Sequence, residues 1–257
     1  MLSTIVDAFL MNLESEGRTP QTVQWYRESL AQLVKWIRSE GHPQDPGNWD
    51  VNTIRFYLVH LRNRTKLDGT PLAGATIAGY ARSLRGFCRW LHEEEFTEAH
   101  LLTRVKLPTA PKVIKSTFTI DECLKLIAAA KESHNPVRDE AILLFMLDSG
   151  VRANELCTLQ TADIDWSQRL AKVSGKGRKQ RFVPFSALTA KVMIRYSAKS
   201  RNTTCGGFFQ TDEGTDMTLS AHRHIVRRIS ERAGVKANPH KFRHTFAITF
   251  LRNGGNV

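Results

Sequence analysis

Two imidazoles and a guanidinium lie close together near the end of the 257-residue sequence, in the segment NPHKFRHTFAITFLRNGGNV. His240, Arg243 and His244 would share one face of a short helix. A guanidinium holds two oxygens of a phosphate group by charge-assisted hydrogen bonds and stays protonated at physiological pH. The cluster is therefore suited to chemistry on a phosphate group, although a surface cluster without a function could have the same composition.

Two further basic motifs precede this segment. Arg152 lies in SGVRANEL, Lys176 follows 24 residues later in GKGRKQR, and His240 follows after another 64 residues in PHKFRH. Each motif alone carries little weight, because Gly-Lys-Gly turns occur in many hairpins. The order and spacing of the three motifs together are specific.

The three motifs resemble those of the tyrosine recombinases, the phage integrase and Xer-like family, and the resemblance covers nearly the whole chain. It implies that a tyrosine hydroxyl attacks a phosphodiester of double-stranded DNA, which gives a 3′-phosphotyrosyl link and a free 5′-hydroxyl. The family uses neither a metal nor a cofactor for this step. Cationic side chains must then balance the negative charge that builds on the non-bridging oxygens.

The resemblance also implies a role for each residue of the cluster. Arg152 and Arg243 would hold the scissile phosphate, and Lys176 would act as the general acid that protonates the leaving 5′-oxygen. His240 would contact the phosphate and assist proton transfer. Glu155 would orient the cations, although an Arg and a Glu three residues apart also form an ordinary helix pair.

The remaining basic residues near these motifs are predicted to position the DNA backbone or to form a solvated surface. His244 is expected to have a structural role, by hydrogen bonding within the core. The predicted DNA-binding residues are Arg178, Lys179 and Arg181 in the hairpin and Arg223 and Arg227 in a later helix.

The family pattern continues after the His/Arg helix with an LGH motif and the nucleophilic tyrosine, and neither occurs before Val257. The four tyrosines, Tyr26, Tyr57, Tyr80 and Tyr196, do not match the pattern and are expected to pack in the core. We therefore predict a site-specific recombinase or integrase truncated before its nucleophile, which would not cleave DNA alone. The alternative is a non-cleaving DNA-binding protein that occupies recombination sites or joins active recombinase subunits. A type IB topoisomerase fits the helical first half poorly.

The charge distribution favours a polyanionic partner for the second half. The formal net charge is +12; residues 1–110 carry 13 Lys and Arg against 12 Asp and Glu, and residues 111–257 carry 24 against 13. Such a bias fits nucleic acid or an acidic membrane surface, and a solvated basic face is the plainer alternative. By the resemblance, the partner is double-stranded DNA, bound by a homotetramer on two recombining sites in the full-length form.

The cysteines and the hydropathy pattern argue for a cytoplasmic protein without a metal site. Cys88, Cys123, Cys157 and Cys205 are widely spaced, so they predict neither a zinc site nor a disulfide framework. The longest apolar run, 141–147, is too short to span a bilayer, and no signal peptide is recognised.

The first half of the chain reads as a small helical bundle. Apolar residues recur every three or four positions in segments around 5–13, from Pro20 to Gly41, from Asp50 and from Gly74. These segments predict a helical core-binding (SAM-like) domain over 1–102. The segment 103–116 contains prolines and cations without periodicity, which is typical of a linker.

The second half, 117–257, is predicted to be an α+β catalytic domain that is incomplete at its C-terminus, so that the whole chain is mainly α with a small β-sheet. Thr119 and Glu122 form a capping-box pattern, and 170–185 has the pattern of a β-hairpin. Further helices are predicted over 188–199, 220–233 and 239–254. In the last helix, Phe242, Phe246 and Phe250 are expected to form the buried face.

Overall fold

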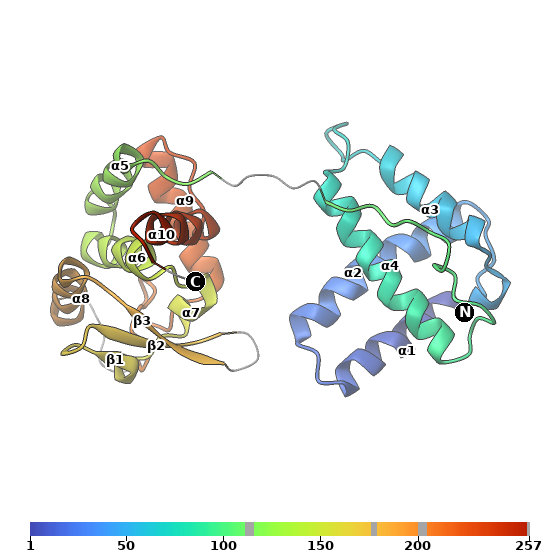
Figure 1. The fold of residues 1–257 in the computed structure, drawn as a ribbon, viewed down its shortest axis with the longest axis horizontal. Coiled ribbons are helices and arrows are strands. Elements are labelled where there is room, and N and C mark those ends of the chain that lie inside the picture. The colour runs from blue at the N-terminus through green and yellow to red at the C-terminus, as the bar shows by residue number, and fades with distance from the viewer. Residues whose placement is uncertain (111–115, 176–178, 200–204, 256–257) are drawn as a thin grey trace. The chain divides into compact units, whose positions relative to one another are not determined.

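The computed structural model describes residues 1–110, 116–175, 179–199 and 205–255. The chain divides into two compact units, Met1–Val113 and Ile114–Val257 (Figure 1). Each unit has its own hydrophobic core. The fold is mainly helical with one small antiparallel sheet, as the sequence predicted.

In the part of the first unit that the structure describes, residues 1–110, four α-helices confirm the predicted bundle. Their N-terminal ends carry the expected signals: the Thr19 hydroxyl accepts a hydrogen bond from the Thr22 amide, and the Asp50 side chain accepts one from the Thr53 amide. The helices are α1 (Leu2–Ser15), α2 (Pro20–Ser39), α3 (Val51–Asn63) and α4 (Gly74–Glu93), and a short 3-10 helix η1 (Pro46–Asn48) precedes α3.

The core of the first unit is apolar and aromatic. Helix α4 packs against α2 and α3, and α1 packs against α2. The ring of Phe9 lies 5.4 Å from those of both Phe87 and Trp90. Trp36 and Trp90 are buried, whereas Trp25 is 37% exposed.

The segment expected to be a linker begins as part of the first unit. Leu101 and Leu102 are buried in the first core, and Val105 and Leu107 pack against it. The predicted linker boundary at residue 103 therefore falls inside a packed segment, because its spaced apolar side chains have a core to contact. The remainder of this segment up to 110 has no regular secondary structure.

The second unit is built around helix α6, which contains the apolar run 141–147. Helices α5, α8 and α10 all pack against α6 (Figure 1). The elements of this unit are α5 (Ile120–Lys131), α6 (Pro136–Ser149), α7 (Ala153–Cys157), η2 (Thr161–Asp163), β1 (Ile164–Asp165), β2 (Leu170–Ser174), β3 (Gln180–Pro184), α8 (Ala187–Lys199), α9 (Leu219–Ala233) and α10 (Pro239–Arg252).

The three strands form an antiparallel sheet in the order β1-β2-β3, and β2 and β3 are the predicted hairpin. Val173 pairs with Arg181, and Ala171 pairs with Val183. Ala171, Val173 and Val183 are buried, whereas Phe182 is 66% exposed. Because successive side chains of a strand alternate between faces, Arg181 lies on the same inward face as Val183.

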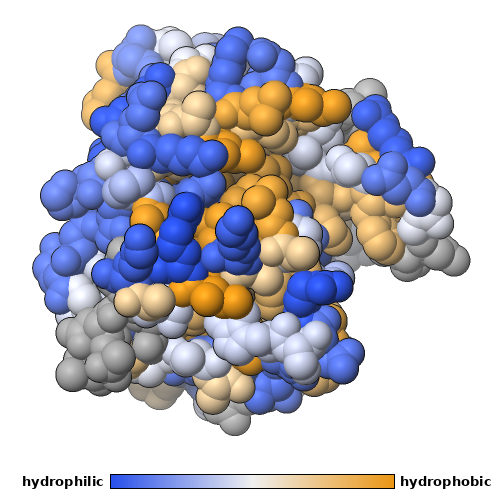
Figure 2. Space-filling view, turned by 90° about the vertical axis from the view of Figure 1, so that its left-hand side faces the viewer, coloured by the Kyte–Doolittle hydropathy of each residue, from blue (hydrophilic) through white to orange (hydrophobic). Residues whose placement is uncertain are grey.

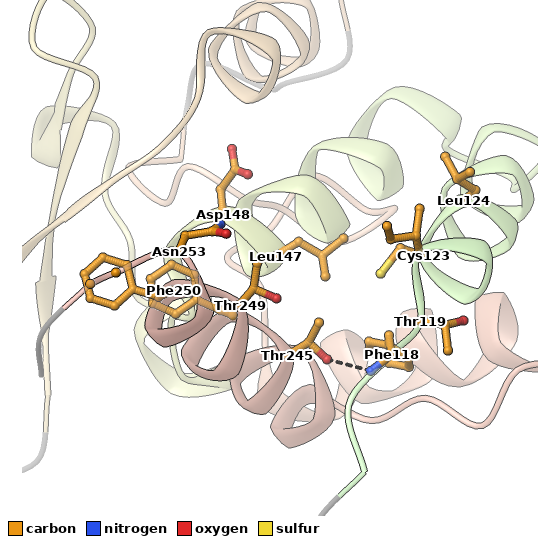
Figure 3. Close-up of a pocket in the computed structure, with 14 residues that line it drawn as sticks. Phe118, Thr119, Cys123, Leu124, Leu147, Asp148, Thr245, Thr249, Phe250 and Asn253 are labelled. Atoms are coloured by element: carbon orange, nitrogen blue, oxygen red, sulfur yellow. Dashed lines mark hydrogen bonds between the residues drawn. The ribbon is translucent and has the colours of Figure 1, made fainter.

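Helix α10 is buried along its first turns only. Phe242 is fully buried and lies 4.8 Å from the Phe118 ring, and the Phe118 amide donates to the Thr245 hydroxyl at 2.9 Å (Figure 3). Phe246 is half-buried and Phe250 is 42% exposed, so the predicted buried phenylalanine face is wrong beyond Phe242.

The later phenylalanines of α10 instead line an open groove of about 680 Å³ with residues of α5 and α6. Figure 3 shows Phe250 beside Asn253 at the end of the helix, away from Phe118. In the space-filling view, hydrophobic surface lies between hydrophilic side chains on the face that is shown (Figure 2). The second unit therefore leaves apolar side chains at its surface.

Among the described residues, no helix combines the length and apolar character needed to cross a membrane. The same residues contain no group of three or more His, Cys, Asp or Glu side chains placed to hold a metal ion.

Candidate phosphate-binding site

A basic cavity of about 400 Å³ lies where α7, α9 and α10 meet. It brings together five residues that the sequence analysis selected from three separate segments. The residues that line the cavity are Arg152, Ala153, Arg223, Val226, Arg227, Ala237, Asn238, Pro239, His240 and Arg243.

The tight turn between α6 and α7 places Arg152 at the cavity. Gly150 ends α6 in the left-handed conformation (φ 58°), and Arg152 then caps the N-terminus of α7. A side chain at position 150 would collide with the Phe246 ring. The turn thus requires glycine both for its backbone conformation and for the close approach of α10.

Arg243 is held in the same place by a contact that the sequence did not reveal. Its Nη1 donates to the carbonyl oxygen of Gly150. Burial lowers the pKa of the Arg243 guanidinium from its ordinary value, and the nearby Arg152 and Arg181 lower it further, whereas Glu155 acts in the opposite sense. Like charges held this close favour binding of an anion, because an anion relieves their repulsion.

Glu155 lies beneath the arginines and is 1% exposed. Its Oε1 accepts from Arg152 Nη1 at 2.8 Å, and its Oε2 accepts from the Arg152 amide at 2.8 Å. Burial opposes ionisation of this carboxyl, yet hydrogen bonds from Arg181 and Arg152 lower its pKa to about 2. Glu155 is therefore an ionised residue that fixes both the backbone and the side chain of Arg152.

The start of α10 places His240 at the opening of the cavity. The Asn238 side chain caps this helix by accepting from the Lys241 amide at 3.0 Å, and Pro239 occupies the first helical position. His240 is exposed on the first turn. A helix N-terminus carries a partial positive charge, which adds to the attraction for a phosphate group.

His244 is half-buried on the same helix and does not line the cavity. Arg223 and Arg227 reach the cavity from α9. Arg227 Nη2 lies 3.0 Å from Nδ1 of His224. Both α9 arginines are exposed.

Among the hairpin residues, Arg181 has a contact that the sequence did not predict. Besides its predicted contact with DNA, it forms two hydrogen bonds with the buried carboxylate of Glu155. Lys179 is exposed, and its carbonyl oxygen accepts from the Gly175 amide at 2.8 Å. Lys176 and Arg178 lie outside the described residues.

Two parts of the site were missed by sequence reasoning. The Arg243 contact with Gly150 joins residues 93 positions apart and has no local signal. The inward direction of Arg181 could have been found, since it is two residues before the apolar Val183 in a predicted strand.

The chain thus combines a helical unit with a mixed unit whose cavity is lined by arginines. Comparison with known proteins identifies the family. Residues 116–257 match the Phage integrase family, and residues 6–95 match the Phage integrase, N-terminal SAM-like domain. The chain belongs to the tyrosine recombinase, or phage integrase, family, whose members act in site-specific DNA recombination and integration.

Individual relatives agree with this assignment. The chain is 30% identical over 268 residues to tyrosine recombinase XerC of Oceanobacillus iheyensis, covering 100% of this chain and 85% of the relative. A lambda integrase dimer bound to a COC′ core site has a similar fold, with a TM-score of 0.77, 16% identity and coverage of 98% of this chain and 90% of that chain. The Tn1549 transposon integrase in complex with a circular intermediate DNA gives a TM-score of 0.76 at 16% identity, with coverage of 98% and 88%.

Proposed function

We propose that this protein binds double-stranded DNA and that its basic cavity holds the phosphate at which a DNA strand is cut and rejoined. The observation that carries the proposal is the convergence of Arg152, Arg243 and His240 from two helices on one cavity. The buried Glu155 fixes Arg152 before any ligand arrives. Preorganised cations of this kind stabilise charge that develops in a transition state.

Each residue has a chemical task in this proposal. The guanidinium groups of Arg152 and Arg243 bind the non-bridging oxygens, and His240 contacts the phosphate and assists proton transfer. Lys176 is the general acid that protonates the leaving 5′-oxygen. Its neighbour in the sequence, Gly175, supports this role, because a Cβ at Gly175 would lie 3.2 Å from Glu155 Oε1 and 3.7 Å from Arg152 Nη1.

The attacking tyrosine is, in this proposal, not among residues 1–257. Tyr26, Tyr57 and Tyr80 belong to the first unit. Tyr196 is 1% exposed in α8, and its hydroxyl accepts from the Gln210 amide at 3.1 Å. None of the four tyrosines lines the cavity. These residues alone would therefore bind DNA without forming a covalent intermediate.

Because none of the four tyrosines lines the cavity, a second candidate function is a DNA-binding protein that occupies recombination sites or joins active subunits without cutting. Both candidates require the same DNA contacts: Arg178 and Lys179 of the hairpin and Arg223 and Arg227 of α9. We propose residues 1–102 as the core-binding domain and 117–257 as the catalytic domain; in the predicted connection 103–116, Val105 and Leu107 still pack against the first core. Because solved relatives include a lambda integrase tetramer bound to a Holliday junction, we propose a tetramer on two DNA sites.

Binding to a duplex of about 30 base pairs, measured by fluorescence anisotropy over a series of salt concentrations, tests the DNA contact. The affinity is expected to fall linearly with salt on logarithmic axes, and Arg152→Ala and Arg243→Ala should each reduce the slope by about one. Arg169→Ala is the matched control, since Arg169 is an exposed arginine outside the cavity. Binding that does not depend on salt would contradict the proposal.

A nicked duplex that traps covalent intermediates tests the tyrosine assignment. Residues 1–257 are expected to give no protein–DNA adduct on a denaturing gel. The adduct should form only when a chain that carries the family's tyrosine is supplied. An adduct formed by residues 1–257 alone, and mapped to one of their four tyrosines, would show that the nucleophile has been misassigned.

A further inference from the structure

Arg181 is held more firmly than a surface cation of a hairpin. Its Nη1 lies 2.5 Å from Glu155 Oε1, and its Nη2 lies 2.9 Å from Glu155 Oε2. This two-point geometry fixes the plane of the guanidinium as well as its position. The side chain of Arg181 is 36% exposed, whereas its partner is 1% exposed. Arg181 does not line the basic cavity.

Glu155 connects Arg181 with Arg152. Each carboxylate oxygen accepts one hydrogen bond from Arg152 and one from Arg181: Oε1 from the two Nη1 atoms, and Oε2 from the Arg152 amide and Arg181 Nη2. Loss of Arg181 would remove half of these bonds and leave a buried carboxylate less well satisfied. The remaining partner, Arg152, would then be drawn more strongly toward Glu155 and away from the cavity.

The same contact secures the end of the hairpin. Arg181 pairs with Val173 in the ladder between β2 and β3, and the ladder is extended where the Gly175 amide donates to the Lys179 carbonyl. Gly175 approaches Glu155 so closely that a Cβ there would lie 3.2 Å from Oε1. Arg181 therefore ties the end of the hairpin, next to Gly175 and Lys179, to Glu155 of α7.

We infer that Arg181 is a positioning residue that acts through Glu155. It holds Arg152 and the two ends of the β2–β3 turn in the positions from which they contact one phosphate group. The inference rests on the proposed function, because it assumes that the cavity binds a phosphate group. It replaces the direct DNA contact that the sequence predicted for Arg181. If Arg181 contacted the phosphate directly, its effect on phosphate binding would not depend on Glu155. If it positions Arg152 through Glu155, its effect would depend on Glu155.

A double-mutant cycle separates these two roles. Inorganic phosphate is the probe, and its binding to Arg181→Ala, Glu155→Gln and the double variant is followed by NMR shifts of the His240 ring and the arginine side chains. Arg181→Ala is expected to weaken phosphate binding about tenfold, as expected when hydrogen bonds to a charged group are lost. In the Glu155→Gln background, the same change should have no more effect than the control Arg169→Ala, which removes one charge from the turn between β1 and β2.

Two readouts distinguish positioning from a general effect on folding. Arg181→Lys should restore only part of the affinity, because an ammonium cannot reproduce the two-point contact. The charged groups that face Glu155 are Arg152 from α7, Arg181 from β3 and Arg243 from α10. The pKa of Glu155, followed through its carboxyl carbon, should rise from about 2 in Arg181→Ala and stay unchanged in Arg169→Ala.

The possible results have different meanings. Additive effects of Arg181→Ala and Glu155→Gln would overturn the inference in favour of direct phosphate contact. An Arg181→Ala variant that binds phosphate as well as Arg169→Ala would also overturn it. If Arg243→Ala binds phosphate as well as the unmodified protein, the proposed function itself fails, and the role of Arg181 fails with it.

Discussion

The two units differ in what they bury. Among the described residues, the buried polar side chains of the first unit are Ser29, Thr53, Ser83 and Thr97, all of them uncharged. The second unit buries Arg138, Asp139, Glu140, Glu155 and His222 besides neutral polar residues. Burial of charge costs free energy unless every group is paired. The core of the first unit thus contains no charged side chain among the described residues, whereas the second unit also buries charges, of which Glu155 contacts the cavity residue Arg152.

The largest effect on stability is expected from removing the buried charge of Arg138, which is 1% exposed. Its Nε donates to Asp139 at 2.8 Å, and its Nη1 donates to Asp212 at 2.6 Å. Arg138→Ala would leave Asp139 buried without its partner, and we expect a loss of about 3–5 kcal/mol in the free energy of unfolding. Hydrogen exchange should rise in peptides of the second unit and stay unchanged in those of the first.

Arg138→Met is the matched variant for this test, because it keeps much of the side-chain volume and removes the charge. Arg138→Met should lower the free energy of unfolding by a similar amount if the unpaired carboxylate of Asp139 causes the effect. A loss that appears in Arg138→Ala and not in Arg138→Met would instead point to packing alone.

The free energy of unfolding of the second unit should depend on pH more than that of the first unit. This effect is expected to be somewhat smaller than that of Arg138→Ala. His222 is fully buried on α9, and burial lowers its pKa to about 4, with Arg223 acting in the same direction. Between pH 6.5 and 4 the unfolded chain therefore binds more protons than the folded protein, so stability is lost as pH falls through this window. The loss for His222 should be about 3 kcal/mol, and hydrogen exchange at a series of pH values measures it.

The control for this prediction is His222→Asn, which removes the titrating group. The pH dependence of the second unit between pH 6.5 and 4 should become smaller in this variant. Glu155 adds a separate loss at lower pH, because its folded pKa of about 2 lies below its ordinary value and its contribution disappears as the carboxyl is protonated. Equal pH dependence in the variant and the unmodified protein would exclude His222 as the cause.

The smallest expected effect concerns the first unit. Thr19 caps α2 through its hydroxyl, and Thr19→Ala should lower the free energy of unfolding by about 1 kcal/mol. The change should appear in hydrogen exchange of α2 and leave phosphate binding by the second unit unaltered. Thr19→Ser, which keeps the hydroxyl, should retain most of the stability. A change in phosphate binding would show that the units are coupled.

Local signals were sufficient for most of the fold. Thr19, Asp50 and Thr119 cap helices where the sequence indicated, and Gly234 ends α9 in a left-handed conformation. The exposed Phe250 was wrongly predicted to be buried, because the period of a helix shows which residues share a face but not how far a neighbour covers that face. The packing of Val105 against the first core was missed for the same reason.

The sequence by itself determined the chemical groups and the helices that carry them: Arg152, His240 and Arg243, their spacing, and the helix predicted over 239–254. Only the tertiary structure decided how these groups meet. The close approach of α10 to Gly150 places Arg243 beside Arg152, and the inward face of β3 gives Arg181 to Glu155. The physical reason is that these contacts depend on packing between elements far apart in the chain, whereas caps and periodicity depend on neighbours.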